Sequence, residues 1–306
     1  MAAKVMPAYS SQFSNKLFTQ PQLLAGLILK TYCRFDYRSF EDWLRTSPEV
    51  CRRLRLRRVP DYSTLCRFFH HKLSQPRLRA LLQHTVRAGQ RQQRGRATVA
   101  LDSTGFEARH VSRYYRWRRR PQRGQRGWPK WAMAVWVQAQ LICAQHCRAD
   151  PRGDFDELPP LARAAARNVP MRCLLANAGY DSEANHRSCR HRLGVRSVIP
   201  PRGHRQGVAS SPYRRSLQRH FPRRLYGQRW KAKTVISVVK RKLGDSLSAR
   251  RQQDQYIQLL LMGVTCNLHR LQIIFVLVIP PSPHLFFDRV STEQDALRIE
   301  AGRGGG

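Results

Sequence analysis

Ala97-Thr98-Val99-Ala100-Leu101-Asp102 is a short apolar stretch that ends on an acidic residue, and its composition predicts a buried β-strand. The segments after it alternate between two kinds of pattern. Strand-like runs follow at 131–143, 172–176 and 196–200, and helical patterns lie between them at 158–167 and 181–193. Strands that alternate with helices predict an α/β protein with a mixed sheet.

Residues 226–243 predict one amphipathic helix at the end of this region. Its apolar residues form a continuous stripe at about 100° per residue. The polar residues beside that stripe are Tyr226, Arg229, Lys233 and Lys240. Such a helix packs on a core and holds polar groups at the edge of the packing. An ordinary amphipathic helix gives the same pattern, so the stripe alone does not establish a site.

Residues 20–85 predict several short helices, with breaks at Ser47-Pro48 and Val59-Pro60 and with Ser63 as a candidate N-cap. Short helices joined by tight turns suit a helix-turn-helix-like DNA module. A helical subdomain packed on a neighbour would look the same.

Two stretches of the sequence indicate little regular structure. The basic segment 86–96 is expected to be a linker, and the Gly/Pro/Arg-rich segment 201–224 is expected to be an irregular loop. We therefore expect a helical N-terminal DNA-binding region at 1–90, a second domain at 91–270 and an unassigned tail at 271–306.

The charge is strongly positive: 56 Lys and Arg against 19 Asp and Glu give a formal net charge of +37 over 306 residues. A field of that sign favours a polyanionic partner, and double-stranded DNA is the leading candidate. One basic stretch interleaves aromatic residues with Arg, which suits contacts to phosphates and exposed bases. Its candidate DNA-binding residues are Arg113, Arg116, Trp117, Arg118, Arg119 and Arg120. A solvated basic loop would have the same composition.

The eight Cys residues form no framework of pairs, and Met1 to Phe13 contains no apolar core of signal-peptide length. The longest apolar run, 271–281, is shorter than the roughly 20 residues of a membrane helix. We therefore expect a cytoplasmic protein with reduced thiols and no membrane partner.

Four segments together resemble a known family. Tyr226-x2-Arg229-x3-Lys233-x6-Lys240 is similar to the Tyr-x2-Arg-x3-Glu-x6-Lys signature of bacterial insertion-sequence transposases of the DDE type. Residues 100–105 resemble the strand that bears the family's first catalytic Asp, which places that role at Asp102. Residues 175–182 resemble the segment of the second Asp, and 198–202 the strand and turn that follow.

The resemblance implies a ribonuclease-H-like fold, a mixed sheet flanked by helices behind a helical N-terminal region. It also implies DNA transposition by metal-dependent strand cleavage and transfer. Two Asp and one Glu of the family bind two Mg²⁺, and Asp102 is the expected metal ligand here. The expected partner is double-stranded DNA, both element ends and target, and a homodimer is a further candidate assembly.

Two positions depart from the family pattern. Asn177 stands where the family has its second catalytic Asp, and Lys233 stands where it has the Glu. Asn keeps a carbonyl oxygen, but an ammonium group repels metal ions. No Asp or Glu occurs from Ala184 to Gly244, so that region offers no substitute. Mg²⁺ is therefore implied by the family and placed in doubt by this chain's own residues.

Three hypotheses remain open at this stage. The first is an insertion-sequence transposase whose own activity is impaired by Asn177 and Lys233. The second is a non-catalytic DNA-binding transposase remnant, which occupies element ends or joins assemblies of intact copies. The third is an unrelated RNA-associated basic protein, for which the four motif segments would be a coincidence.

Overall fold

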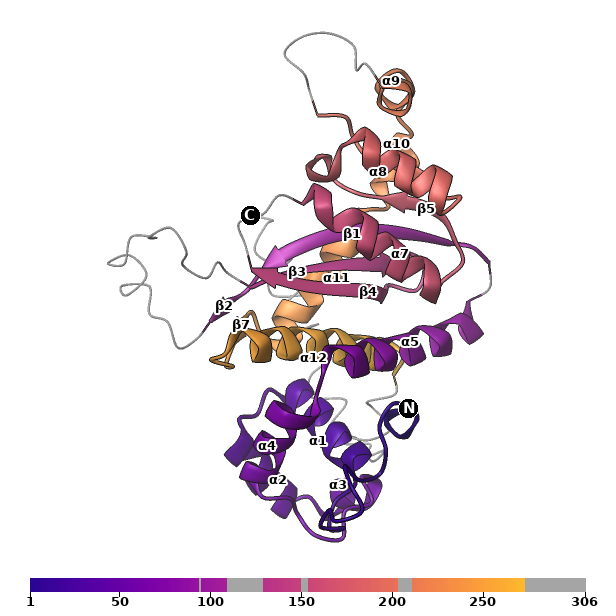
Figure 1. Cartoon of the computed structure of the whole chain (residues 1–306). Coiled ribbons are helices and arrows are strands. Elements are labelled where there is room, and N and C mark those ends of the chain that lie inside the picture. The colour runs from indigo at the N-terminus through magenta and orange to yellow at the C-terminus, as the bar shows by residue number, and fades with distance from the viewer. Residues whose placement is uncertain (94, 109–128, 150–153, 203–210, 273–306) are drawn as a thin grey trace, which may run out of the picture.

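The structure is a computed structural model that describes residues 1–93, 95–108, 129–149, 154–202 and 211–272. Its N-terminal part is helical, as the sequence predicts (Figure 1). The elements there are η1 (Ala2–Lys4), α1 (Gln20–Cys33), α2 (Tyr37–Arg45), α3 (Pro48–Arg53) and α4 (Tyr62–Lys72).

Side-chain caps fix where these helices begin. Thr19 and Gln22 form a capping box at the start of α1, and the Asp36 carboxylate accepts from Ser39 N at the start of α2. At α4 the cap is Asp61, which accepts from Ser63 N. The expectation that Ser63 caps this helix is therefore wrong by two residues, because Ser63 lies inside the helix and its N–H is the one that Asp61 caps.

Helix α5 (Gln75–Gln92) extends through most of the stretch expected to be a linker. Val86 is fully buried against the sheet, and Gln90 Nε2 donates to Asn168 O at 2.9 Å. The polar composition of 86–96 thus belongs to the outer face of a packed helix.

The centre of the molecule is a five-stranded mixed sheet with the order β4-β3-β1-β5-β6. Its strands are β1 (Ala97–Gly105), β3 (Pro129–Trp136), β4 (Leu141–Ala149), β5 (Met171–Leu175) and β6 (Arg196–Val198). Strand β3 pairs antiparallel with β1 and β4, whereas β1, β5 and β6 pair in parallel. A second, two-stranded sheet pairs β2 (Glu107–Ala108) with β7 (Ser246–Leu247).

Helices cover both faces of the central sheet (Figure 1). Helix α7 (Leu158–Asn168) packs on β3, β4 and β5, and α11 (Trp230–Leu243) and α12 (Gln252–Arg270) pack on the opposite side. The remaining elements are η2 (Phe155–Glu157), η3 (Ala178–Tyr180), α8 (Glu183–Arg187), η4 (Ser188–Arg192), α9 (Pro212–Arg219) and α10 (Arg223–Gly227).

Strand β1 shows why both faces must be covered. Val99 and Leu101 belong to the core under α7, while Ala100 belongs to the core shared with α11, α12 and the N-terminal helices. All three residues are fully buried. A continuous apolar run is the expected pattern for such a strand. The α/β prediction of a ribonuclease-H-like mixed sheet flanked by helices is confirmed.

Helices α5 and α12 lie side by side between the N-terminal helices and the sheet (Figure 1). Asn267 of α12 joins these layers, since it exchanges hydrogen bonds with the Ile142 backbone of β4 and donates to Thr85 Oγ1 of α5 at 2.9 Å. None of the described helices is long and apolar enough to span a lipid bilayer.

Three expected elements differ from the structure. The run 131–143 is split into β3 and β4, because Gln140 takes a positive φ of 53° in the turn that joins them. Part of 201–224 is helical rather than irregular, since α9 and the start of α10 lie within it. The helix expected at 226–243 is interrupted after Gly227, so Tyr226 lies in α10 and Arg229 is the N-cap residue of α11.

Candidate functional site

Three polar residues lie near the ends of strands at one edge of the sheet. Asp102 belongs to the second half of β1, Asn177 follows β5, and Asp154 follows β4 after a short gap. Because β1, β4 and β5 run in the same direction, their carboxyl ends lie at the same edge. The register pairs Ala100 with Leu175, so Asp102 and Asn177 each lie two residues beyond a paired position.

Asp102 faces the start of α11. Its side chain is nearly buried, and Arg229 Nη1 lies 3.6 Å from Asp102 Oδ1. Burial raises the pKa of the Asp102 carboxyl, and the positive charges of Arg229 and of the exposed Lys233 oppose that rise. The position expected to hold a metal ligand is thus flanked by two basic side chains from one helix.

Asn177 forms a tight turn at the end of β5. Its Oδ1 accepts from Gly179 N at 2.7 Å, as Asn side chains do in turns. A Cβ on Gly179 would lie 2.7 Å from Asn177 Oδ1 and 3.4 Å from Asp154 Oδ2. The glycine therefore allows the backbone to approach both side chains, and the amide oxygen of Asn177 is already engaged.

Asp154 is a neighbour of Asp102 that the sequence reasoning missed. Its Oδ1 lies 2.6 Å from Lys130 Nζ and 3.4 Å from Arg148 Nη2, and Ser103 Oγ donates to the same oxygen at 3.5 Å. The negative charge of Asp154 contributes to the raised pKa of Asp102. The sequence contained a weak signal, since Asp154 belongs to a group of four acids, at 150, 154, 156 and 157, that follows the long apolar run.

The other residues of the signature lie around this edge. The Tyr226 ring packs edge-on against Phe221, with ring centres 5.0 Å apart, and the Arg229 guanidinium lies 5.7 Å from the Tyr226 ring centre. Lys240 Nζ donates to Gly105 O at 3.1 Å and lies 5.1 Å from the Phe106 ring centre. Lys240 therefore ties α11 to the end of β1.

Asp181 anchors the turn that carries Asn177. Its buried carboxylate accepts from Arg202 N at 2.8 Å and pairs with Arg214 Nη2 at 2.8 Å. Arg202 Nε also donates to Ala178 O at 2.9 Å. Arg214 of α9 thus serves this anchor.

The residues at this edge do not fit the magnesium pair that the family resemblance implies. Hard cations take oxygen ligands, and carboxylates are the strongest of these. Within the described residues, no three His, Cys, Asp or Glu side chains come together in an arrangement that could hold a metal ion. Asp102 and Asp154 both contact basic side chains, and the Glu position is Lys233. A divalent cation would have to displace these charges before it could bind.

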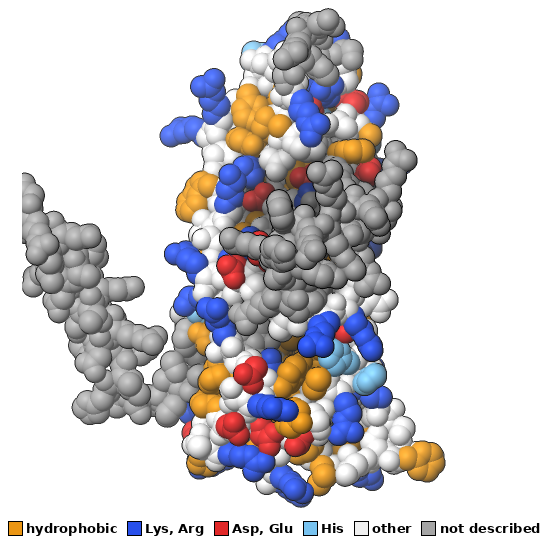
Figure 2. Space-filling view, turned by 90° about the vertical axis from the view of Figure 1, so that its left-hand side faces the viewer, with side chains coloured by type: hydrophobic (Ala, Val, Ile, Leu, Met, Phe, Trp, Pro, Cys, Tyr) orange, Lys and Arg blue, Asp and Glu red, His pale blue; other side chains and the backbone are white. Residues whose placement is uncertain are grey.

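Basic side chains extend well beyond this edge. Figure 2 shows Lys and Arg along the length of one face, with Asp and Glu between them. Such a face attracts a polyanion without specifying its sequence. The candidate DNA-binding residues Arg113, Arg116, Trp117, Arg118, Arg119 and Arg120 lie outside the described residues.

Comparison with known proteins agrees with the fold and with the motif segments. The family model described as transposase DDE domain matches residues 93–268. These residues include the whole central sheet together with Asp102, Asn177 and Lys233. No curated protein matches the chain. Because the match covers more than half of its length, the chain belongs to the transposase DDE domain family.

Proposed function

We propose that this chain is an insertion-sequence transposase that binds duplex DNA and whose own strand cleavage and transfer are impaired. Membership of the family supports transposition as the ancestral activity. The net charge of +37 supports tight, largely sequence-independent contact with DNA phosphates. Asn177 and Lys233, in place of the family's carboxylates, support the loss of metal-dependent chemistry.

The observation that carries the proposal is the surroundings of Asp102. Arg229 lies 3.6 Å from this carboxylate, and Lys233 adds a second positive charge from the next turn of α11. Two unit charges 4 Å apart interact by about 4 kcal/mol at an effective dielectric constant of about 20. Repulsion of that size offsets the attraction that one carboxylate offers to a divalent ion.

The same charges favour a phosphate group at this edge. Lys130, Arg148, Arg229 and Lys233 lie around Asp102 and Asp154, and Arg148 also pairs with Glu157, so four basic side chains face three acids. The chain's own residues would hold and orient a DNA backbone here, and would not assemble a cluster of carboxylates for cleavage.

A second candidate is the non-catalytic DNA-binding remnant. It is favoured by the contacts of Asp154, because the additional carboxylate near Asp102 is itself paired with Lys130 and Arg148. The two candidates differ in one measurable property, which is residual cleavage that depends on Asp102.

The test uses the full chain and a duplex that carries the inverted repeats flanking its coding region. We expect the duplex to be bound and to be nicked very slowly in Mg²⁺. Residual nicking that Asp102→Ala abolishes identifies an impaired transposase, and binding without any nicking identifies a remnant. Rapid Mg²⁺-dependent nicking by the unmodified chain would contradict both.

Restoring the family's carboxylates tests the site positions themselves. The double change Asn177→Asp and Lys233→Glu returns three carboxylates to the edge, and calorimetry should then detect Mg²⁺ binding that the unmodified chain lacks. Lys233→Ala is the matched control, because it removes the repulsion but supplies no ligand. A folded double variant without Mg²⁺ binding would show that these are not the metal positions.

A further inference from the structure

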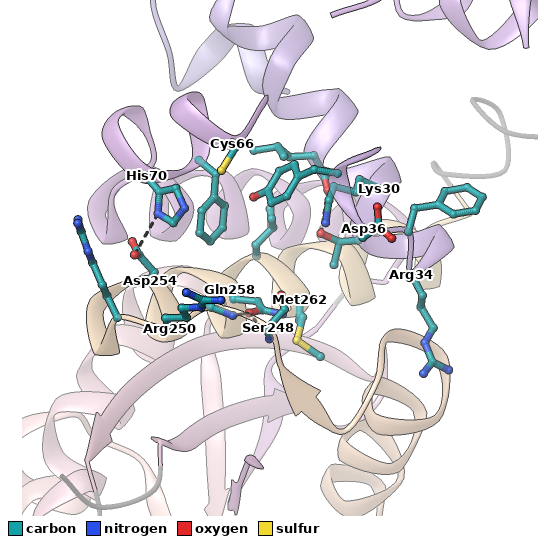
Figure 3. A pocket seen from close by; sticks show the side chains of 18 of the residues that line it. Lys30, Arg34, Asp36, Cys66, His70, Ser248, Arg250, Asp254, Gln258 and Met262 are labelled. Carbon is teal, nitrogen blue, oxygen red and sulfur yellow. Dashed lines mark hydrogen bonds and ion pairs between the residues drawn. The ribbon is translucent and has the colours of Figure 1, made fainter. Parts of the chain in front are cut away.

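A cavity of about 590 Å³ lies between the N-terminal helices and the α12 side of the molecule (Figure 3). Lys30, Tyr37 and Cys66 line it from α1, α2 and α4, and Arg250 and Met262 line it from the opposite wall. Volumes of about 300–1,000 Å³ are typical of sites for small ligands. The lining includes none of Asp102, Asn177 or Lys233, so the cavity is separate from the edge described above.

The two walls are joined by a contact between His70 and Asp254. His70 Nδ1 of α4 lies 3.0 Å from Asp254 Oδ2 of α12, as the dashed line in Figure 3 marks. The segment before α12 is fixed as well, since Gln258 Oε1 accepts from Ser248 N and Ala249 N at 3.2 and 3.1 Å. The walls of the cavity are therefore fixed by specific contacts between the N-terminal helices and α12.

Cations outnumber acids in the lining. The basic side chains are Lys30, Arg34, Arg67, Arg250 and Arg251, and the acidic ones are Asp36 and Asp254. Both acids have partners, because Asp36 caps α2 through Ser39 and Asp254 pairs with His70. The surplus of positive charge favours an anionic ligand.

Among these cations, Lys30 differs in its contacts and in its pKa. Its ammonium lies 4.1 Å from the centre of the Tyr37 ring, and Figure 3 shows it directed from α1 toward the opposite wall. Burial lowers the pKa of Lys30 to about 8, because desolvation disfavours its charged form. Lys30 is half-buried and the charge of Asp36 already opposes this shift, so a bound anion would strengthen an attraction that is present in part.

Part of the lining is apolar or aromatic, with Leu27, Phe35, Phe69 and Leu261 beside Tyr37 and Met262, and polar side chains such as Thr31, Ser246 and Ser248 complete it. A ligand that matches both the basic and the apolar side chains of the cavity has a flat, apolar ring system and an attached anionic group. We propose that the cavity binds a nucleotide, with its base against the apolar wall and its phosphate near Lys30 and Arg250. The nucleotide is either free or the terminal unit of a single DNA strand.

The test measures binding of dAMP to the full chain by calorimetry, with deoxyadenosine and inorganic phosphate as half-ligands. We expect saturable dAMP binding and at least tenfold weaker binding of each half. Lys30→Met removes the charge and keeps the length of the side chain, and it should weaken dAMP binding about tenfold, as the loss of a charged hydrogen bond does. Lys72→Met is the matched control, since Lys72 is exposed on α4 and outside the lining.

Photolabelling with 8-azido-dAMP locates the ligand independently of the variants. Labelled peptides should contain Tyr37 or Met262, and labelling confined to other segments would overturn the proposal. Equal dAMP affinity in Lys30→Met and in the unmodified chain would also overturn it. If Lys30→Met does not fold, Arg250→Met takes its place, because Arg250 is exposed and removable without opening the core.

The source of the nucleotide is decided by a competition. A 5′-phosphorylated single strand that displaces 8-azido-dAMP from these peptides identifies a strand end as the ligand. Displacement by dAMP alone, with the strand bound elsewhere on the basic surface, identifies a free nucleotide. Both outcomes support the site, and displacement by neither overturns it.

Discussion

Arg229 and Asp102 face one another across the junction of α11 and β1, with Nη1 3.6 Å from Oδ1. Both side chains are largely buried, and Arg229 Nη1 has no hydrogen-bond partner within the described residues. The pair is therefore an electrostatic contact in a region of low solvent access. Its two members come from segments that the sequence places far apart, and it sets the charge of the candidate site.

Removing the Arg229 guanidinium should lower the unfolding free energy at neutral pH. Burial raises the pKa of Asp102 and Arg229 opposes the rise, so Arg229→Met should raise that pKa further. An acid with a raised pKa costs stability above its unfolded pKa of about 3.9, and we expect a loss of about 1–3 kcal/mol at pH 7.

The loss should shrink as the pH falls through the raised pKa of folded Asp102, which lies above the unfolded value of about 3.9, and should vanish where Asp102 is protonated in both folded proteins. Urea unfolding at pH 7 and pH 3.5 measures it, provided that the chain is still folded at the lower pH. Arg241→Met serves as the control, because Arg241 is exposed on the same helix. A loss that is equal at both pH values would mean that Arg229 acts through packing alone.

DNA affinity should depend steeply on salt. A chain with a net charge of +37 that neutralises roughly 6–10 phosphates releases as many counterions. The logarithm of the binding constant should then fall with the logarithm of the salt concentration with a slope of about −5 to −9. Fluorescence titrations of a labelled duplex at four salt concentrations give the slope, and a flat dependence would contradict electrostatic binding.

The sequence predicted the elements of the fold better than their boundaries. The strands at 97–102, 172–176 and 196–200 and the helix at 158–167 are present, because continuous apolar runs and helical spacing leave few alternatives. The division of 131–143 was missed, since both sides of the turn are apolar and the turn depends on the backbone at Gln140. Helix α5 was missed beyond residue 85 because its polar residues conceal the burial of Val86.

The site was only partly accessible from the sequence. The motif segments identified Asp102, Asn177 and Lys233, and the structure places them at or near one edge of the sheet. Asp154 was not identified, because it belongs to no motif and comes to this edge only through the direction of β4. The pairing of Asp181 with Arg214 was also hidden, since 33 residues separate them in the chain.

Two helical glycines should respond to alanine in opposite directions. A Cβ at Gly263 of α12 would lie 2.1 Å from Gln145 Oε1 and 3.0 Å from Trp131 Cζ2, both in buried side chains. Gln145 is held by its bond to Leu260 O at 3.0 Å, so it cannot move aside freely. Gly263→Ala should therefore cost about 1–3 kcal/mol of unfolding free energy.

Gly26 of α1 is the matched position. A Cβ there would meet Leu65 Cδ2 and Phe40 Cε1 at 3.7 Å, which is ordinary van der Waals contact. Gly26→Ala should stabilise the protein by about 0.5–1 kcal/mol, because alanine loses less backbone entropy in a helix. Thermal unfolding of the two variants gives the sign of the stability change in each. Stabilisation by Gly263→Ala would show that α12 packs less closely on β3 and β4.

His186 is fully buried beside the Asp181 anchor. Its Nδ1 lies 2.8 Å from Ser197 Oγ, and its Nε2 lies 3.9 Å from Asp181 Oδ1. Burial lowers the pKa of His186 and the charge of Arg190 adds to this, while Asp181 and Glu183 oppose it. The unfolded chain therefore takes up a proton at this position more readily than the folded chain, and stability should fall as the pH drops below about 6.5.

His84 and His269 have lowered pKa values too, so the decisive quantity is the difference in pH dependence between variants. His186→Asn keeps a polar group near Ser197 and cannot be protonated, so unfolding free energies measured between pH 5 and pH 8 should show a smaller slope. His71→Asn, at an exposed position, should leave the slope unchanged. An undiminished slope in His186→Asn would place the pH dependence elsewhere in the fold.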